Sequence, residues 1–83
     1  MKNLYVGNLP HSATEPQIRT LFEVHGAVER VSIVIDKETG RPKGFAFVEM
    51  TDASAADKAC QALSGSEMEG RALRVNEAKA KTH

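Results

Sequence analysis

Four stretches of the chain alternate apolar and polar residues with period two, and two stretches between them repeat apolar residues every three or four positions. Period-two alternation is typical of a strand with one buried face, whereas the longer repeat is typical of an amphipathic helix. The pattern therefore predicts the order strand, helix, strand, strand, helix, strand. The strands are expected over residues 3–8, 28–36, 43–50 and 71–77, and the helices over 15–25 and 53–63.

Capping residues mark the start of both helices. Thr14 can cap the first helix, Gln17 can complete a capping box, and Pro16 lies in the first turn, where its missing N–H costs nothing. Gly26 predicts the end of this helix, and Asp52 is expected to cap the second one. The apolar stripes that predict the buried helix faces are Ile18, Leu21 and Phe22 in the first helix, and Ala56, Ala59, Cys60 and Leu63 in the second.

The strand over residues 43–50 has an unusual outer face. Its inner face is small and aliphatic, with Gly44, Ala46, Val48 and Met50, whereas its outer face carries Lys43, Phe45, Phe47 and Glu49. Exposed apolar surface of this kind marks a binding site. Bases stack on aromatic rings, and a flanking lysine suits their phosphates. The alternative is an ordinary strand with buried phenylalanines, but an inner face is already supplied by Ala46 and Val48.

The order of elements is that of the ferredoxin-like α+β sandwich, in which two helices cover one face of a four-stranded antiparallel sheet. In the spatial order usual for this fold, the first and third strands are central neighbours. That order places Tyr5 beside Phe47, with Phe45 near them, on the uncovered face. The same face is expected to carry Arg30, Ser32, Val34, Arg74 and Asn76. Residues expected to face the helices are Val31, Ile33, Ile35, Leu73 and Val75.

Composition and charge narrow the functional class only slightly. Eleven basic and eleven acidic residues give a net charge of zero, so we expect only modest affinity for a nucleic acid. The longest apolar runs are only a few residues and predict no membrane span. The single cysteine, Cys60, excludes an internal disulfide and a cysteine-paired metal site. These features predict a cytoplasmic protein, or a nuclear one in a eukaryote.

Two motifs resemble those of the RNA recognition motif family. Residues 4–9, Leu-Tyr-Val-Gly-Asn-Leu, match its hexapeptide, in which an aliphatic, an aromatic and an aliphatic residue precede Gly-Asn-Leu. Residues 43–50 match its octapeptide at seven of eight positions. Only Met50 departs, where an aromatic residue is usual, and that position faces inward. The resemblance extends from Leu4 to about Ala78 and is similar to the small single-motif RNA-binding proteins of bacteria.

This resemblance implies a monomeric domain over residues 1–78, followed by a short polar tail over 79–83. The domain would bind single-stranded RNA on the uncovered sheet face. By resemblance, Tyr5 and Phe47 each stack a base, and Phe45 packs against sugars. The expected phosphate contacts are Lys43, Arg30, Arg41, Arg74 and Lys79, with Val34 on the same face. The residues expected to offer polar or main-chain contacts to base edges are Asn76, Ala78 and Lys79.

Two other functions are compatible with the same fold. Some members of the family bind peptides or proteins, typically when the sheet aromatics are missing, whereas all three are present here. An enzyme is disfavoured, because acylphosphatases of similar fold use an arginine in the loop after the first strand, and loop 8–12 has none. No motif predicts a cofactor, and the histidines His11, His25 and His83 are too scattered to bind a metal. The sequence leaves open the base preference and the choice between RNA and single-stranded DNA.

Overall fold

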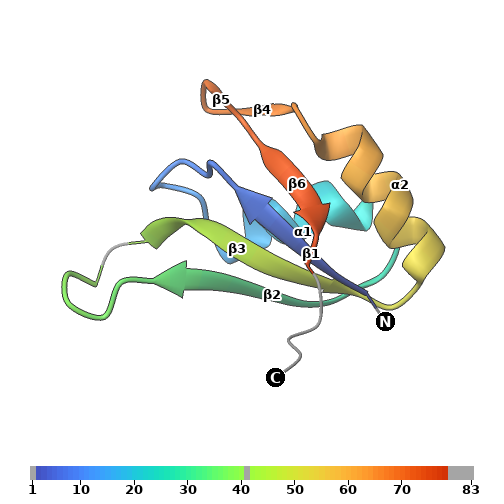
Figure 1. The fold of residues 1–83 in the computed structure, drawn as a ribbon, viewed down its shortest axis with the longest axis horizontal. Helices are drawn as coiled ribbons and strands as arrows, with labels where there is room; N and C mark the ends of the chain where they lie inside the picture. Colours follow the sequence, from blue (N-terminus) through green and yellow to red (C-terminus); the bar gives the residue numbers. More distant parts are fainter. Residues whose placement is uncertain (1, 41, 79–83) are drawn as a thin grey trace.

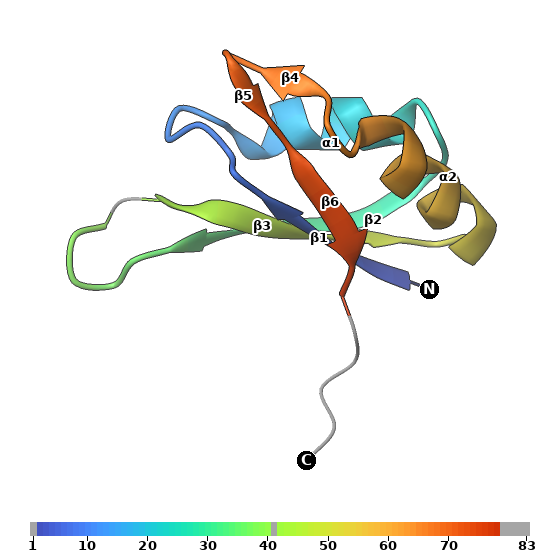
Figure 2. The same ribbon diagram turned by 45° about the horizontal axis from the view of Figure 1, so that its top comes forward.

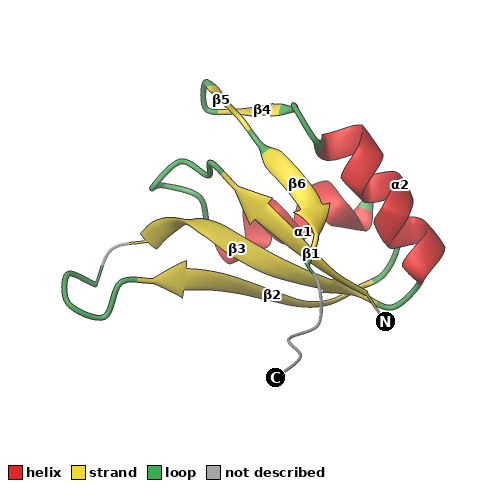
Figure 3. Ribbon diagram, in the orientation of Figure 1, coloured by secondary structure: helices red, strands yellow, loops and turns green. Residues whose placement is uncertain are grey.

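The computed structural model describes residues 2–40 and 42–78, and at Pro42 and Lys43 it describes the backbone only. The elements follow the expected order, with two short strands added before the last one (Figure 3). Their bounds are β1 Lys2–Gly7, α1 Glu15–Glu23, β2 Val28–Ile35, β3 Pro42–Met50, α2 Ala53–Leu63, β4 Glu67–Met68, β5 Arg71–Ala72 and β6 Arg74–Glu77. Within these residues, neither helix has the length and hydrophobicity of a membrane span.

The main sheet has four strands in the order β2-β3-β1-β6, and every neighbouring pair is antiparallel. Both helices lie on the same side of it, which leaves the other face uncovered (Figures 1 and 2). The central strands β1 and β3 pair with Tyr5 opposite Phe47, and β1 pairs with β6 so that Tyr5 is also opposite Asn76. The predicted sandwich of one four-stranded sheet and two helices is therefore confirmed.

Both predicted helix caps are present. The Thr14 side chain accepts a hydrogen bond from the backbone N–H of Gln17 at 3.4 Å, and the Gln17 side chain accepts one from the Thr14 backbone N–H at 3.0 Å. These two bonds form the expected capping box. The Asp52 carboxylate accepts a hydrogen bond from the backbone N–H of Ser54 at 2.9 Å. Both helix starts thus satisfy backbone donors that the helix itself leaves without partners.

The chain that leaves α1 passes close to α2. The helix ends at Glu23, two residues before the predicted end at residue 25. A Cβ atom placed on Gly26 would lie 2.5 Å from the Cβ of Ala55 in α2. Gly26 is therefore required by the close approach of the two segments, rather than as the residue that ends the helix.

The core lies between the sheet and the helices. Phe22 on α1 is its largest completely buried side chain, so the helical spacing correctly predicted this ring as core. The Cys60 thiol is partly buried and donates a hydrogen bond to the backbone oxygen of Val75 at 3.1 Å. Burial raises the pKa of this thiol, in agreement with a packing role. Other completely buried side chains are Leu4, Val6, Ile18, Ala46, Val48, Met50, Ala56 and Ala59.

The segment expected as one strand over residues 71–77 is divided at Leu73. The Leu73 N–H donates to the Ser66 oxygen at 2.7 Å, and the Leu73 oxygen accepts from the Gly65 N–H at 2.8 Å. Residues 65–70, between the second predicted helix and the last predicted strand, contain β4, which pairs with β5 in a separate two-stranded hairpin. Only β6 then continues in the main sheet, and its inward residue Val75 is buried as predicted.

One residue expected to face the core is exposed. Ile35 at the end of β2 is 52% exposed, whereas Val31 on the same strand is 5% exposed. The β2–β3 hairpin projects beyond the helix layer at this end (Figures 1 and 2). The pairing of β2 with β3 is also irregular between Ile33 and Ile35. The prediction for Ile35 was therefore wrong, because no helix reaches far enough to cover it.

Candidate nucleic-acid interface

Three aromatic rings meet at the centre of the uncovered sheet face. Tyr5 comes from β1, and Phe45 and Phe47 come from β3. The ring centroid of Tyr5 is 5.7 Å from that of Phe45 and 5.9 Å from that of Phe47, and the two phenylalanine centroids are 6.2 Å apart. Phe47 meets both other rings edge-on, an arrangement that aromatic pairs favour. We call these three residues the aromatic cluster.

The pairing of β1 with β3 explains why the cluster forms. Side chains alternate between the two faces of a strand, so Phe45 and Phe47 share one face while Ala46 and Val48 are completely buried on the other. Tyr5 is the cross-strand partner of Phe47. Phe47 remains 38% exposed, and Tyr5 and Phe45 are intermediate in burial. The cluster thus presents apolar ring surface to solvent at a site that no other described segment covers.

Gly7 makes room for the Tyr5 ring. A Cβ atom on Gly7 would lie 2.7 Å from the Tyr5 hydroxyl oxygen and 2.8 Å from a ring carbon. Gly7 and Tyr5 are two residues apart on the same strand and therefore share a face. The glycine of the hexapeptide thus allows the tyrosine to lie against the backbone beside the cluster.

The two residues that follow Gly7 turn the chain away from the sheet. Asn8 has a φ of 60°, in the left-handed region that asparagine tolerates better than most residues. Its side-chain N–H donates to the backbone oxygen of Ala72 at 2.7 Å. Leu9 is buried, and its backbone N–H donates to the Gly44 oxygen at 2.8 Å. The Gly-Asn-Leu end of the hexapeptide therefore fixes the edge of the aromatic cluster next to β3 and β5.

The basic residues differ in whether they already have acidic partners. Lys2 forms ion pairs with Asp57 and Glu77, and the hydrogen bond to Asp57 raises the pKa of its amine. Arg19 on α1 forms an ion pair at 3.7 Å with the carboxylate one helical turn further along, and it also donates a hydrogen bond to a backbone oxygen. Within the described residues, Arg30 and Arg74 form no ion pair, and both are exposed. These two predicted phosphate contacts are therefore available to an anion.

The other predicted contacts are spread around the cluster. Val34 on β2 is partly buried, and Asn76 on β6 is exposed opposite Tyr5. The Ala78 N–H already donates a hydrogen bond to the Asn3 backbone oxygen at 2.9 Å. Two of the remaining predicted contacts, Arg41 and Lys79, lie outside the residues that the structure describes. The third, Lys43, is described for its backbone only.

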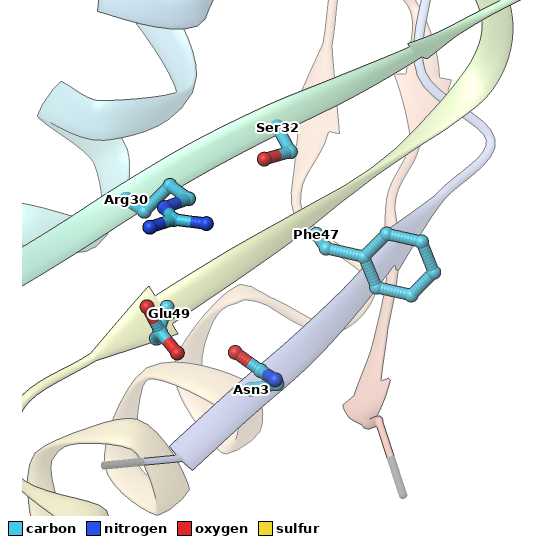
Figure 4. Close-up of a pocket in the computed structure, with 5 residues that line it drawn as sticks. All are labelled: Asn3, Arg30, Ser32, Phe47 and Glu49. Carbon is cyan, nitrogen blue, oxygen red and sulfur yellow. The ribbon is translucent and has the colours of Figure 1, made fainter. Parts of the chain in front are cut away.

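A hollow of about 180 Å³ adjoins the cluster and was not predicted from the sequence. Figure 4 shows the five residues that line it, namely Asn3, Arg30, Ser32, Phe47 and Glu49. Asn3 and Arg30 are the partners of Glu49 on the two neighbouring strands. The alternation along the strand did predict that Glu49 faces outward. It could not predict which side chains of the two neighbouring strands lie beside Glu49, because that depends on the register of the three strands.

Comparison with known proteins places the chain in a family. The model of the RNA recognition motif matches residues 4–74. A protein of Nostoc sp. named "Putative RNA-binding protein RbpE" is 48% identical over 77 residues, which cover 93% of this chain and 78% of that protein. The crystal structure of RNA binding protein PG1 covers all of both chains, with 40% identity and a TM-score of 0.93.

A third relative was solved with a ligand. The structure of the Rna15 RNA recognition motif with bound RNA (GU) has a TM-score of 0.84 and 32% identity, and the match covers 94% of this chain and 83% of that one. The family match spans both motif peptides and most of the described sheet. This chain belongs to the RNA recognition motif family.

Proposed function

We propose that this domain binds single-stranded RNA, without catalysis, on the uncovered face of its sheet. The observation that carries the proposal is the aromatic cluster of Tyr5, Phe45 and Phe47, whose rings are partly exposed at the centre of that face. Family membership supports it, as does the related Rna15 domain that was solved with RNA bound. Residues 1–78 act as a monomeric binding unit in this proposal.

Stacking supplies most of the binding energy in this proposal. Tyr5 and Phe47 each stack one base, and Phe45, which is less exposed than Phe47, packs against the sugars between them. A base stacked on an aromatic ring contributes about 1–3 kcal/mol by alanine substitution. Because every base has a π-face, such stacking selects single strands rather than a base sequence.

Phosphate contacts add a smaller electrostatic contribution. Arg30 on β2 and Arg74 on β6 flank the cluster from the two edge strands, and neither forms an ion pair with a described residue. Lys43, Arg41 and Lys79 complete the proposed set. Net charge is zero, so no general positive field adds to these contacts. The affinity should therefore fall only slowly with salt, since each phosphate contact to a single strand contributes about 0.7 to the log–log slope.

Binding should be confined to unpaired RNA. Tyr5 is the only tyrosine and the chain has no tryptophan, so its fluorescence reports directly on the cluster. We expect a short single-stranded RNA to quench this fluorescence and the same sequence in a duplex to leave it unchanged, because paired bases cannot reach the rings. A single-stranded DNA of the same sequence measures the contribution of the 2′-hydroxyl groups. Equal affinity for duplex and single strand would contradict stacking on the cluster.

Replacing Gly7 with alanine should weaken binding even though it removes none of the three rings of the aromatic cluster. The new methyl group would meet the Tyr5 ring at less than 3 Å, so the ring must move away from its place beside Phe47. We expect a loss of affinity up to that of one stacked base, about fivefold to 150-fold. The control is the same change in a Tyr5→Ala background, where it should have no further effect. Wild-type affinity of Gly7→Ala would show that the position of Tyr5 does not matter.

A further inference from the structure

We propose that the hollow beside Phe47 is a guanine-selective base site, in which Glu49 and Arg30 read the two edges of one guanine. This inference rests on the proposed RNA-binding function, adds a base preference to it, and assigns Arg30 to a base in place of a phosphate. The hollow is open to the same face as the aromatic cluster, because Phe47 belongs to both (Figure 4). A base that follows the one stacked on Phe47 therefore lies over it.

The size of the hollow fits one base. Its volume is about 180 Å³, which is smaller than the roughly 300–1,000 Å³ of pockets that enclose larger ligands. Apart from Phe47, every residue that lines it is polar: Asn3, Arg30, Ser32 and Glu49. An aromatic edge with four polar groups suits a flat heterocycle whose rim carries hydrogen-bonding atoms.

The polar groups around the hollow are not engaged with one another. Asn3 and Arg30 flank Glu49 as cross-strand partners, and side chains in such positions lie close enough to act on one ligand. Nevertheless, no hydrogen bond or ion pair within the described chain uses the side chain of Asn3, Arg30, Ser32 or Glu49.

The chemistry of these groups distinguishes the four bases. An ionised carboxylate only accepts hydrogen bonds and can accept two in parallel, while a guanidinium only donates and also does so in pairs. Guanine is the one base with two neighbouring donors, at N1 and N2, and two neighbouring acceptors, at O6 and N7. It can therefore satisfy Glu49 and Arg30 in bidentate fashion at once. Adenine, cytosine and uracil offer the carboxylate at most one ring or exocyclic donor group.

Oligonucleotides with a single changed base test this assignment. The probes are a uridine hexamer and versions with one guanosine, adenosine, cytidine or inosine at the fourth position. We expect the wild-type domain to bind the guanosine hexamer about fivefold to 150-fold more tightly than the others, as a good bidentate pair provides. Inosine lacks the N2 amine, so it should lose most of this advantage. A wild-type domain that binds all hexamers equally would overturn the guanine assignment.

Two substitutions then identify the residues that read the base. Glu49→Gln should bring the ratio of guanosine to adenosine affinity close to one, because an amide nitrogen would face a donor of guanine. Arg30→Lys keeps the positive charge but loses the paired donors, so it should also reduce the ratio. Glu67→Gln, an exposed carboxylate on β4, is the control and should leave the ratio unchanged.

The outcomes separate this inference from the proposed function. If the guanosine preference survived both Glu49→Gln and Arg30→Lys, the hollow would not be the reading site. If RNA bound with quenching of Tyr5 but without any base preference, only the guanine site would be overturned. If no hexamer bound at all, the proposed RNA-binding function would fail with it. Thermal melting of each variant shows whether the fold is retained.

Discussion

Replacing Tyr5 and Phe47 together with alanine is expected to reduce the affinity for short single-stranded RNA by roughly 30-fold to 25,000-fold. Each ring is proposed to stack one base, and each stack contributes about 1–3 kcal/mol. Each single variant should lose about fivefold to 150-fold. The ring centroids are 5.9 Å apart, so removal of one ring also disturbs its neighbour. The losses should therefore combine with a measurable coupling energy in a double-mutant cycle.

The measurement is a titration of labelled RNA by fluorescence anisotropy, since Tyr5 itself is removed. Val24→Ala is the matched control, because Val24 is 79% exposed at the C-terminal end of α1, in the helix layer. It removes exposed apolar surface without touching the sheet. A folded double variant that binds RNA as tightly as the parent would exclude the aromatic cluster as the binding platform. It would favour a protein-interaction module instead.

Phe22→Ala should act on the stability of the fold, which it should lower by a large amount. Phe22 is completely buried between α1 and the sheet, and truncation of a buried phenylalanine costs about 3–5 kcal/mol. An 83-residue domain is expected to have only roughly 4–12 kcal/mol of stability in total. Urea denaturation should therefore show a midpoint far below that of the parent, or a chain that is already unfolded.

The same change at Phe47 provides the comparison. Phe47 is 38% exposed, so Phe47→Ala leaves a smaller void and should lower the free energy of unfolding much less than Phe22→Ala. The change from phenylalanine to alanine should therefore act mainly on folding stability at position 22. At position 47 it should act mainly on RNA affinity. If Phe22→Ala were as stable as the parent, Phe22 would not be a core residue. If Phe47→Ala unfolded the domain, its ring would belong to the core rather than to the binding face.

The sequence predicts those features that depend on local geometry. Alternation along β3 places Phe45 and Phe47 on one face and Ala46 on the other, because successive side chains point in opposite directions. The capping box of Thr14 and Gln17 is equally local, since both residues lie within one helical turn. Such features need no knowledge of the rest of the chain.

The features that the sequence does not predict depend on distant segments. The division of the last strand at Leu73 results from its backbone bonds to Ser66 and Gly65, and backbone pairing leaves no trace in residue type. The exposure of Ile35 depends on how far the helix layer extends over the β2–β3 hairpin. The hollow beside Phe47 forms only when Arg30 and Glu49 are brought into register across two strands. Alternation predicts the face of each residue, but not its neighbour on the next strand.

The mutual contacts of the aromatic cluster also bear on the entropy of binding. Tyr5, Phe45 and Phe47 contact one another at centroid distances of 5.7–6.2 Å in the free protein, and the Tyr5 ring lies against the backbone at Gly7. Immobilising a flexible side chain at an interface costs about 0.5–1.5 kcal/mol. Here folding has already ordered the rings, so they form a pre-organised receptor. The loss of conformational freedom on association then falls almost entirely on the nucleic acid, and a more flexible single strand should bind with a larger unfavourable entropy.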